Sequence, residues 1–169
     1  MFNLPQRPCK LGPAISNNGE KHGDKRVAAF SIPISDVMLT QDELATVLDI
    51  RDAGVFFTLD DPPKPSMPML SHLPIAEEFE SAEVVLGFAL SGETIVTLQG
   101  CTLSGLALEQ QVGGLTKASF RVYCVPPIDE HWNELYLHLG AELRIAIGDV
   151  KHPAQQGSLA LVPPPAQAA

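Results

Sequence analysis

Alternation of apolar and polar residues predicts a protein built mainly from β-strands. From Val27 to Ile34 apolar side chains fall at every second position, the period of a strand with one buried face. Pro33 lies inside this run and has no N–H to donate, so we expect an edge strand or a strand end. After Glu83 the same period recurs in short runs between turn residues. These runs predict strands at 84–90, 93–98, 102–109, 115–125 and 142–150, with a further short strand at 55–59.

The run from Leu115 to Val125 alternates most clearly. One set of side chains is small or apolar and the other is polar: Ala118, Phe120, Val122 and Cys124 against Lys117, Ser119, Arg121 and Tyr123. Such alternation is typical of an antiparallel sheet with one face on the core and one in water. Residues 83–125 are therefore predicted to form a meander. Cys124 should be a small buried residue, whereas Cys101 follows a turn signal and is expected to be exposed.

Two short helices interrupt the strands. Thr40 followed by Glu43 has the spacing of a capping box, and Leu39 with Leu44 has that of a hydrophobic staple. This helix should end near 49–52. A second helix opens at Asp129, where four apolar residues recur at helical spacing and a glycine follows as a C-terminal cap: Ile128, Trp132, Leu135, Leu139 and Gly140.

These elements predict a mostly-β fold (β-rich α+β): an antiparallel sheet or sandwich with a C-terminal meander and two short helices. In the 169-residue chain we expect an irregular N-terminal arm at 1–26, a single β-rich domain at 27–151 and a flexible Pro/Ala/Gln tail at 152–169. The Pro-rich connection at 61–74 is either an extended crossing over the surface or a functional loop. An edge strand at Val27–Ile34 would allow homo-oligomerisation by sheet pairing.

The charge of the chain narrows its range of partners. Acidic residues outnumber basic ones by 20 to 11, giving a net charge of −9, and the only basic concentration is Lys21, Lys25 and Arg26. A protein that binds duplex DNA through its phosphates usually presents a basic face, so duplex binding is disfavoured. Single-strand binding is still compatible with this charge, because a local groove with aromatic residues can act within an acidic protein.

Cysteine usage and hydropathy indicate an intracellular protein. Three cysteines without CxxC spacing predict neither a disulfide framework nor a Cys-rich zinc site. The opening MFNLPQRPCKLG has no apolar core of signal-peptide length, and no apolar run is long enough to span a bilayer. We therefore expect a cytoplasmic protein with no membrane partner.

No set of residues has the spacing of a catalytic or metal site. His131, Glu134 and His138 lie on the polar face of the second helix but lack the HExxH register, which favours a solvated face. No serine lies in a GxSxG elbow, and there is no P-loop or GxGxxG motif. We expect no enzymatic activity, no cofactor, no metal and no catalytic residues.

The polar face of the 115–125 strand offers the best candidate surface. Lys117, Arg121 and Tyr123 alternate there, and Arg144 on the closing strand is a candidate extension. A ring that stacks on a base and cations that hold the backbone are what a single-strand platform needs. The competing interpretation is an ordinary exposed strand, whose charged residues keep the protein in solution through cross-strand pairs.

Several segments together resemble a family of small proteins of tailed phages and prophages. They are KLG at 10–12, EKHGDKRVAAFSIPIS at 20–35, LSGETIVTLQGCTLSGLAL at 90–108 and GGLTKASFRVYCVPP at 113–127. The shared pattern is an HG turn before an alternating strand and a GG hairpin before an FRV-type strand. The resemblance implies a viral protein of the early region, in the bacterial host cytoplasm, with a nucleic-acid or host-factor binding role. Where the family often has a charged ending, this chain ends in Ala, Pro and Gln.

Two functional hypotheses follow. The first is a non-enzymatic phage-type accessory protein that binds single-stranded nucleic acid in recombination or replication through Lys117, Arg121, Tyr123 and Arg144. The second is a protein–protein interaction module, either a host-factor inhibitor or a small structural component of a phage particle. Its contact elements would be the Pro-rich loop and the apolar patch Leu159–Val162 in the tail.

Overall fold

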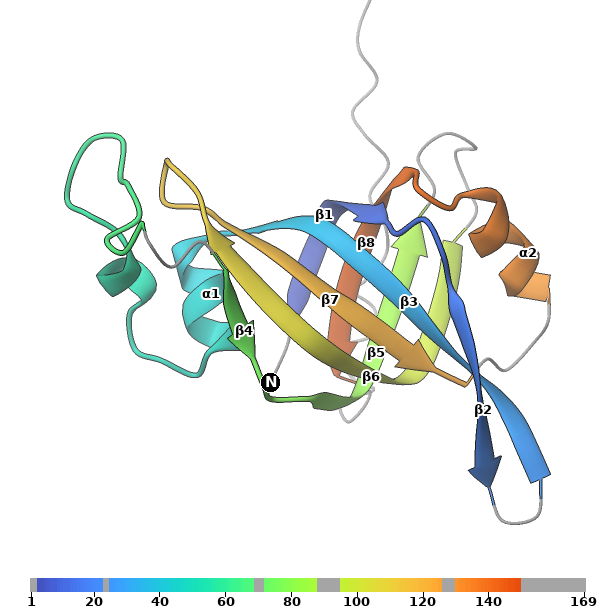
Figure 1. The fold of residues 1–169 in the computed structure, drawn as a ribbon. Coiled ribbons are helices and arrows are strands. Elements are labelled where there is room, and N and C mark those ends of the chain that lie inside the picture. Colours follow the sequence, from blue (N-terminus) through green and yellow to red (C-terminus); the bar gives the residue numbers. More distant parts are fainter. Residues whose placement is uncertain (1–2, 23–24, 69–71, 88–94, 126–129, 150–169) are drawn as a thin grey trace, which may run out of the picture.

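The fold is mostly β with two short helices, as predicted, and its sheet closes into an antiparallel barrel (Figure 1). The structure is a computed structural model that describes residues 3–22, 25–68, 72–87, 95–125 and 130–149. The elements in these ranges are β1 (Leu4–Leu11), β2 (Ser16–His22), β3 (Lys25–Leu39), α1 (Gln41–Val47), the 3-10 helix η1 (Ala53–Phe56), β4 (Leu73–Ile75), β5 (Phe79–Gly87), β6 (Ile95–Gln110), β7 (Thr116–Cys124), α2 (Glu130–Leu137) and β8 (Glu142–Asp149). No helix in these ranges is long and apolar enough to cross a membrane.

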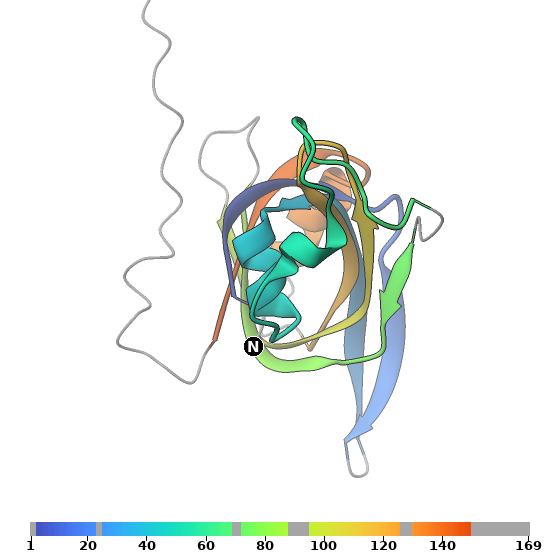
Figure 2. The same cartoon turned by 90° about the vertical axis from the view of Figure 1, so that its left-hand side faces the viewer.

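The barrel closes because β3 pairs with the first strand as well as with β7. Neighbouring strands follow the order β1-β8-β5-β6-β7-β3, and β3 returns to β1 through the pairs Lys10–Ser35 and Leu11–Ile34. Outside this ring, β2 forms an antiparallel hairpin with β3, and β4 pairs with β6. Seen from the α1 end, the strands surround a core and α1 lies across the opening (Figure 2).

Apolar residues at alternate strand positions fill the barrel. On β7 the predicted inner face is confirmed, since Ala118, Phe120, Val122 and Cys124 are all buried. Leu143, Ile145 and Ile147 of β8 are buried in the same way, and Leu135 anchors α2. The interior is thus occupied by side chains, which leaves the outer faces of the strands as the surface on which a site can be built.

The expected irregular arm at 1–26 is wrong, since most of it is strand. β1 pairs with β8 along much of its length, and β2 forms a hairpin with the start of β3. Both strands were missed in the sequence because β1 contains two prolines and β2, which reads SNNGEKH, is polar throughout. Leu4 and Leu11 of β1 are nevertheless fully buried. The predicted tail at 152–169 lies outside the described residues.

The prediction that Val27–Ile34 is an edge strand is wrong from Phe30 onward. There β3 pairs with β7 on one side, and with β2 and then β1 on the other. Within the described strands, residues 27–29 pair with β2 alone. Pro33 is tolerated because it falls between the last β2 pair, at Ser31, and the first β1 pair, at Ile34. The Pro33 carbonyl accepts a hydrogen bond from Gly12 N at 2.8 Å. The side of Pro33 that lacks an N–H therefore faces the connection between β1 and β2. Homo-oligomerisation by sheet pairing stays a prediction, and in this strand the edge open to it is limited to residues 27–29.

The first helix confirms the predicted capping box. Thr40 Oγ1 accepts from Glu43 N, and the Glu43 carboxylate accepts from Thr40 N at 2.8 Å. Leu44 and Val47 are buried, and the helix ends at Val47, two residues before the predicted 49–52. Arg7 of β1 pairs with Glu43, which ties the helix to the barrel wall.

The short strand predicted at 55–59 is wrong. Asp52 caps η1 instead, its carboxylate accepting from Gly54 N at 2.7 Å. Val55 and Leu59 are strongly exposed, so no buried strand face exists there. The described part of the Pro-rich connection folds back locally, with Thr58 N donating to Lys64 O at 2.7 Å.

The meander is confirmed as β5, β6 and β7, although two of its predicted strands are one. The runs 93–98 and 102–109 are both part of β6, because Gly100 and Gly105 adopt positive φ and absorb irregularities in the pairing instead of ending the strand. The predicted turn at 91–92 lies outside the described residues. Since β6 continues through residue 101, Cys101 faces the core and is fully buried, which contradicts its expected exposure.

Candidate nucleic-acid interface

The outward residues of β7 form a continuous surface with β6 and β3. Backbone register places Tyr123 between Thr102 and Ser31 on one rung. The next rung places Arg121 between Ser104 and Pro33. Opposed residues of an antiparallel pair point to the same face, so these side chains lie together on the outer face of the sheet, where Ser31 is buried at 7% exposure. We call this surface the β7 platform: Ser31, Pro33, Thr102, Ser104, Lys117, Ser119, Arg121 and Tyr123.

Arg121 is the exposed cation at the centre of the β7 platform. Its Nη1 donates to Ser31 Oγ at 3.5 Å, and within the described ranges it forms no ion pair with a carboxylate. A guanidinium carries five N–H donors, so a single hydroxyl partner leaves most of them available. Ser104 lies directly opposite on β6. An exposed guanidinium with free N–H donors and a serine directly opposite it has the chemistry of a phosphate contact.

Tyr123 lies two residues further along the same face. It is half-buried, and its neighbours on the rung are the hydroxyl residues Thr102 and Ser31. A phenol held partly in a sheet surface presents a rigid aromatic group with little rotational freedom to lose. Arg121 and Tyr123 are therefore brought together on one strand, as the sequence predicted.

Lys117 lies at the other end of the β7 platform and is already neutralised. Its Nζ is 2.8 Å from Glu109 Oε2, directly across on β6. This hydrogen bond raises the pKa of Lys117, and hydrogen bonds from Lys117 and Gln111 lower the pKa of Glu109. Both groups are charged at neutral pH, so the pair contributes no net positive charge.

A pocket of about 190 Å³ lies beside this ion pair, lined by Ser35, Asp36, His72, Ala107, Glu109, Lys117, Ala118 and Ser119. Two carboxylates against one ammonium make it a poor phosphate site. Sequence reasoning missed Glu109 and His72 here. The Glu109 pairing depends on the β6–β7 register, which is offset by an irregularity between Ser104 and Ala107.

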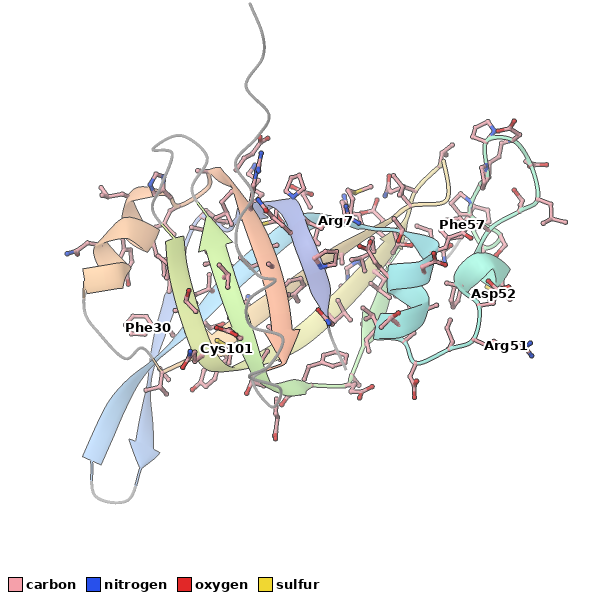
Figure 3. All side chains as sticks on the ribbon, turned by 180° about the vertical axis from the view of Figure 1, so that it is seen from behind. Arg7, Phe30, Arg51, Asp52, Phe57 and Cys101 are labelled. Atoms are coloured by element: carbon pink, nitrogen blue, oxygen red, sulfur yellow. The ribbon has the colours of Figure 1, made fainter. Side chains whose placement is uncertain are left out.

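Arg144 does not extend the β7 platform. It points outward from β8, between the buried Leu143 and Ile145. In the barrel β8 is three strands from β7 in either direction, through β5 and β6 or through β1 and β3. Figure 1 shows β3, β7 and β6 on the near side, and Figure 3, turned by 180°, shows β8 and β5 there. Arg144 thus lies on the opposite side of the barrel.

The hairpin of β2 and β3 extends from the barrel next to the Tyr123 rung. Its pairs run from Ser16–Ser31 outward to His22–Lys25, and it projects beyond the barrel in Figure 1. We call the paired residues 16–22 and 25–31 the β2–β3 arm, or simply the arm. It contains Lys21, Lys25 and Arg26, three of the eleven basic residues of the chain. Since Ser31 belongs to both, the arm and the β7 platform are continuous.

No protein family, no curated protein and no solved structure matches this chain. The resemblance to phage proteins remains a prediction. The site must therefore be interpreted from its own chemistry.

Among the described residues, no group of three or more His, Cys, Asp or Glu side chains could hold a metal ion. Of the two histidines predicted to lie on the second helix, His138 follows the end of α2 and is half-buried, and the side chain of His131 lies outside the described residues. The three cysteines are buried free thiols.

Proposed function

We propose that this protein is a non-enzymatic, phage-type accessory protein that binds single-stranded nucleic acid across the β7 platform and the arm. The observation that carries the proposal is the exposed Arg121, which has a hydroxyl partner and no carboxylate in the described ranges, beside Tyr123 on the same face. The guanidinium would hold a phosphate, and the phenol would stack on a neighbouring base, a contact worth about 1–3 kcal/mol. The phage assignment and the bacterial cytoplasm rest on the sequence resemblance alone.

Charge restricts the strength and salt dependence of this binding. Arg121, Lys21, Lys25 and Arg26 could neutralise at most four phosphates, which predicts a slope of log K against log salt of about −3 or shallower. The net charge of −9 opposes approach of any polyanion. Binding should therefore be moderate at low salt and weak at physiological salt.

The test is fluorescence anisotropy with a labelled single-stranded oligonucleotide at low and moderate salt. Tyr123→Ala should weaken binding about tenfold, because one stacking contact is lost, whereas Tyr123→Phe should bind like the wild type. Tyr136→Ala is the matched control, since Tyr136 is 46% exposed on α2. Absence of binding by the wild type at low salt, where electrostatic attraction is strongest, would refute the proposal.

A protein–protein module is the second candidate, and one group of residues favours it. Leu59 is fully exposed and Val55, Met67 and Val112 are strongly exposed, all in loops or in η1. Gly113 N donates to Pro63 O at 2.7 Å, which holds the β6–β7 turn against the Pro-rich loop. Exposed apolar groups of this kind are typical of a contact surface. A host-factor inhibitor or a particle component would use it.

Comparison of the wild type with Leu59→Ser separates this second function from the first. A protein module predicts that a host or phage protein co-purifies with the wild type and not with the variant. Oligonucleotide binding should be the same for both proteins. Solution molar mass, measured alongside by light scattering, decides whether the partner is a second copy of the chain.

A further inference from the structure

Two thiols from neighbouring strands meet inside the barrel, on the inner face of β6 and β7 and next to the Thr102–Tyr123 rung of the β7 platform. Thr102 pairs with Tyr123, so the same register places Cys101 opposite Cys124. Both side chains are buried, at 0% and 2% exposure, and they share a hydrogen bond. Figure 3 labels Cys101 at this place.

The backbone geometry at this pair suits a disulfide. Gln111 N donates to Leu115 O at 2.8 Å, so the backbone groups of Leu115 and of alternate residues up to Tyr123 point toward β6. Cys124 falls between such positions, and its pair with Cys101 is of the non-hydrogen-bonded type. Opposed Cα atoms in such pairs lie about 4.5 Å apart. This separation is inside the range of about 4.4–6.8 Å found across disulfides.

We propose that Cys101 and Cys124 are a redox site that forms a reversible disulfide between β6 and β7 when the protein meets a low-molecular-weight disulfide such as oxidised glutathione. In the first step the thiolate of one cysteine attacks a sulfur of the oxidant and displaces one glutathione thiolate. The partner cysteine then loses its proton and attacks the mixed disulfide, which releases the second glutathione. Two S–H bonds are lost, one S–S bond forms, and two electrons pass to the oxidant.

The order of attack follows from the hydrogen bond between the two thiols. Cys101 donates to Cys124, and together with burial this raises the pKa of Cys101, while the same contact lowers the pKa of Cys124. Cys124 is the last residue of β7 and is followed by the half-exposed Val125. Cys124 is therefore the attacking thiol and Cys101 the resolving one.

Cys9 provides an internal control. It lies on β1, which is not a neighbour of β6 or β7 in the sheet. Burial, with the nearby charge of Asp36, raises its pKa to about 12, so its thiolate is scarcely populated at neutral pH. It should keep its thiol under conditions that oxidise the pair.

The experiment treats the full chain with oxidised glutathione, removes the reagent, and counts the remaining thiols by alkylation in denaturant and intact mass. One free thiol should remain, the proteolytic map should join the peptides of Cys101 and Cys124, and dithiothreitol should restore three thiols. Cys9→Ser should still form the bond, whereas Cys101→Ser and Cys124→Ser should not.

Retention of all three thiols, a stable glutathione adduct without a bridge, or a bridge that includes Cys9 would overturn the proposal. The test does not depend on whether either serine variant folds, because the wild type and Cys9→Ser supply the decisive maps. As a second measurement, the oxidised wild type should unfold at a higher temperature than the reduced form, since the bridge closes the loop from residue 101 to residue 124. An unchanged or lower unfolding temperature would contradict an unstrained bridge.

Discussion

Replacing Glu43 tests whether one carboxylate joins the first helix to the barrel. The side chain accepts from Thr40 N at 2.8 Å and pairs with Arg7 of β1. Glu43→Ala removes both contacts without changing the apolar core. It leaves the Thr40 N–H without its partner and leaves the Arg7 guanidinium, whose side chain is 34% exposed, without its carboxylate.

The expected loss can be estimated contact by contact. A helix cap contributes about 1 kcal/mol. The hydrogen bond to Arg7 is charge-assisted, but solvent reaches Arg7, so its contribution is nearer 1 kcal/mol than the 3 kcal/mol of a buried pair. Glu43→Ala should therefore lower the free energy of unfolding by about 2 kcal/mol. Glu43→Gln keeps an acceptor for Thr40 and should lose about half as much.

Urea unfolding followed by circular dichroism measures the effect. The matched control is Asp42→Ala, the exposed neighbour in the first turn of α1, which should change stability by about 0.5 kcal/mol or less. If the free energy of unfolding of Glu43→Ala lies within about 0.5 kcal/mol of the wild type, a spread typical of neutral surface substitutions, the assigned role of Glu43 is wrong.

The same contacts predict a pH dependence. Burial alone would raise the pKa of Glu43, but hydrogen bonds from Thr40 and Arg7 outweigh it and hold the pKa below its usual value. A carboxylate with a lowered pKa stabilises the fold above its unfolded pKa, about 4.3, and loses this contribution as the pH falls through its folded pKa. As the pH falls through that window, the difference in free energy of unfolding between the wild type and Glu43→Gln should shrink. An undiminished difference would contradict the ionic part of the account.

Four further substitutions test the fold and the site. Leu103→Ala, at a core position 2% exposed, should lower the free energy of unfolding by about 2–5 kcal/mol in urea. Gly12→Ala should lower the free energy of unfolding by about 1–3 kcal/mol, because its Cβ would lie 2.3 Å from the Pro33 ring. At Gly100 an added Cβ meets no atom within 4 Å, so Gly100→Ala should destabilise the protein less, through the positive φ alone. Glu109→Gln should tighten oligonucleotide binding several-fold at low salt, since the neighbouring ammonium loses its carboxylate partner; unchanged affinity would place that end of β7 outside the interface.

The elements were predictable where local chemistry alone determines them. Thr40 and Glu43 specify a helix start through their own side chains, and the alternation around Phe120 specifies a strand with one buried face. Val55–Leu59 was mispredicted because apolar residues in a loop resemble a short strand, while Asp52 caps a 3-10 turn there.

Long-range pairing could not be predicted in the same way. Pro33 indicated an edge, yet barrel closure places β1 and β2 on the same side of β3 with a gap at the proline. At the candidate site, the shared face of Arg121 and Tyr123 was predictable from the alternation of residues within β7. The neutralisation of Lys117 by Glu109 and the remote position of Arg144 depend on strand order and register, which leave no local signal.

The central claim is that single-stranded nucleic acid binds on the β7 side of the barrel. Its most direct test compares Arg121→Ala with Arg144→Ala in oligonucleotide anisotropy, because the two arginines lie on opposite sides. Both variants remove one positive charge, so the total charge of the protein changes equally. The account predicts that Arg121→Ala weakens binding about tenfold and flattens the salt slope by about 0.7, while Arg144→Ala stays within about twofold of the wild type. Equal losses, or a loss confined to Arg144→Ala, would contradict it.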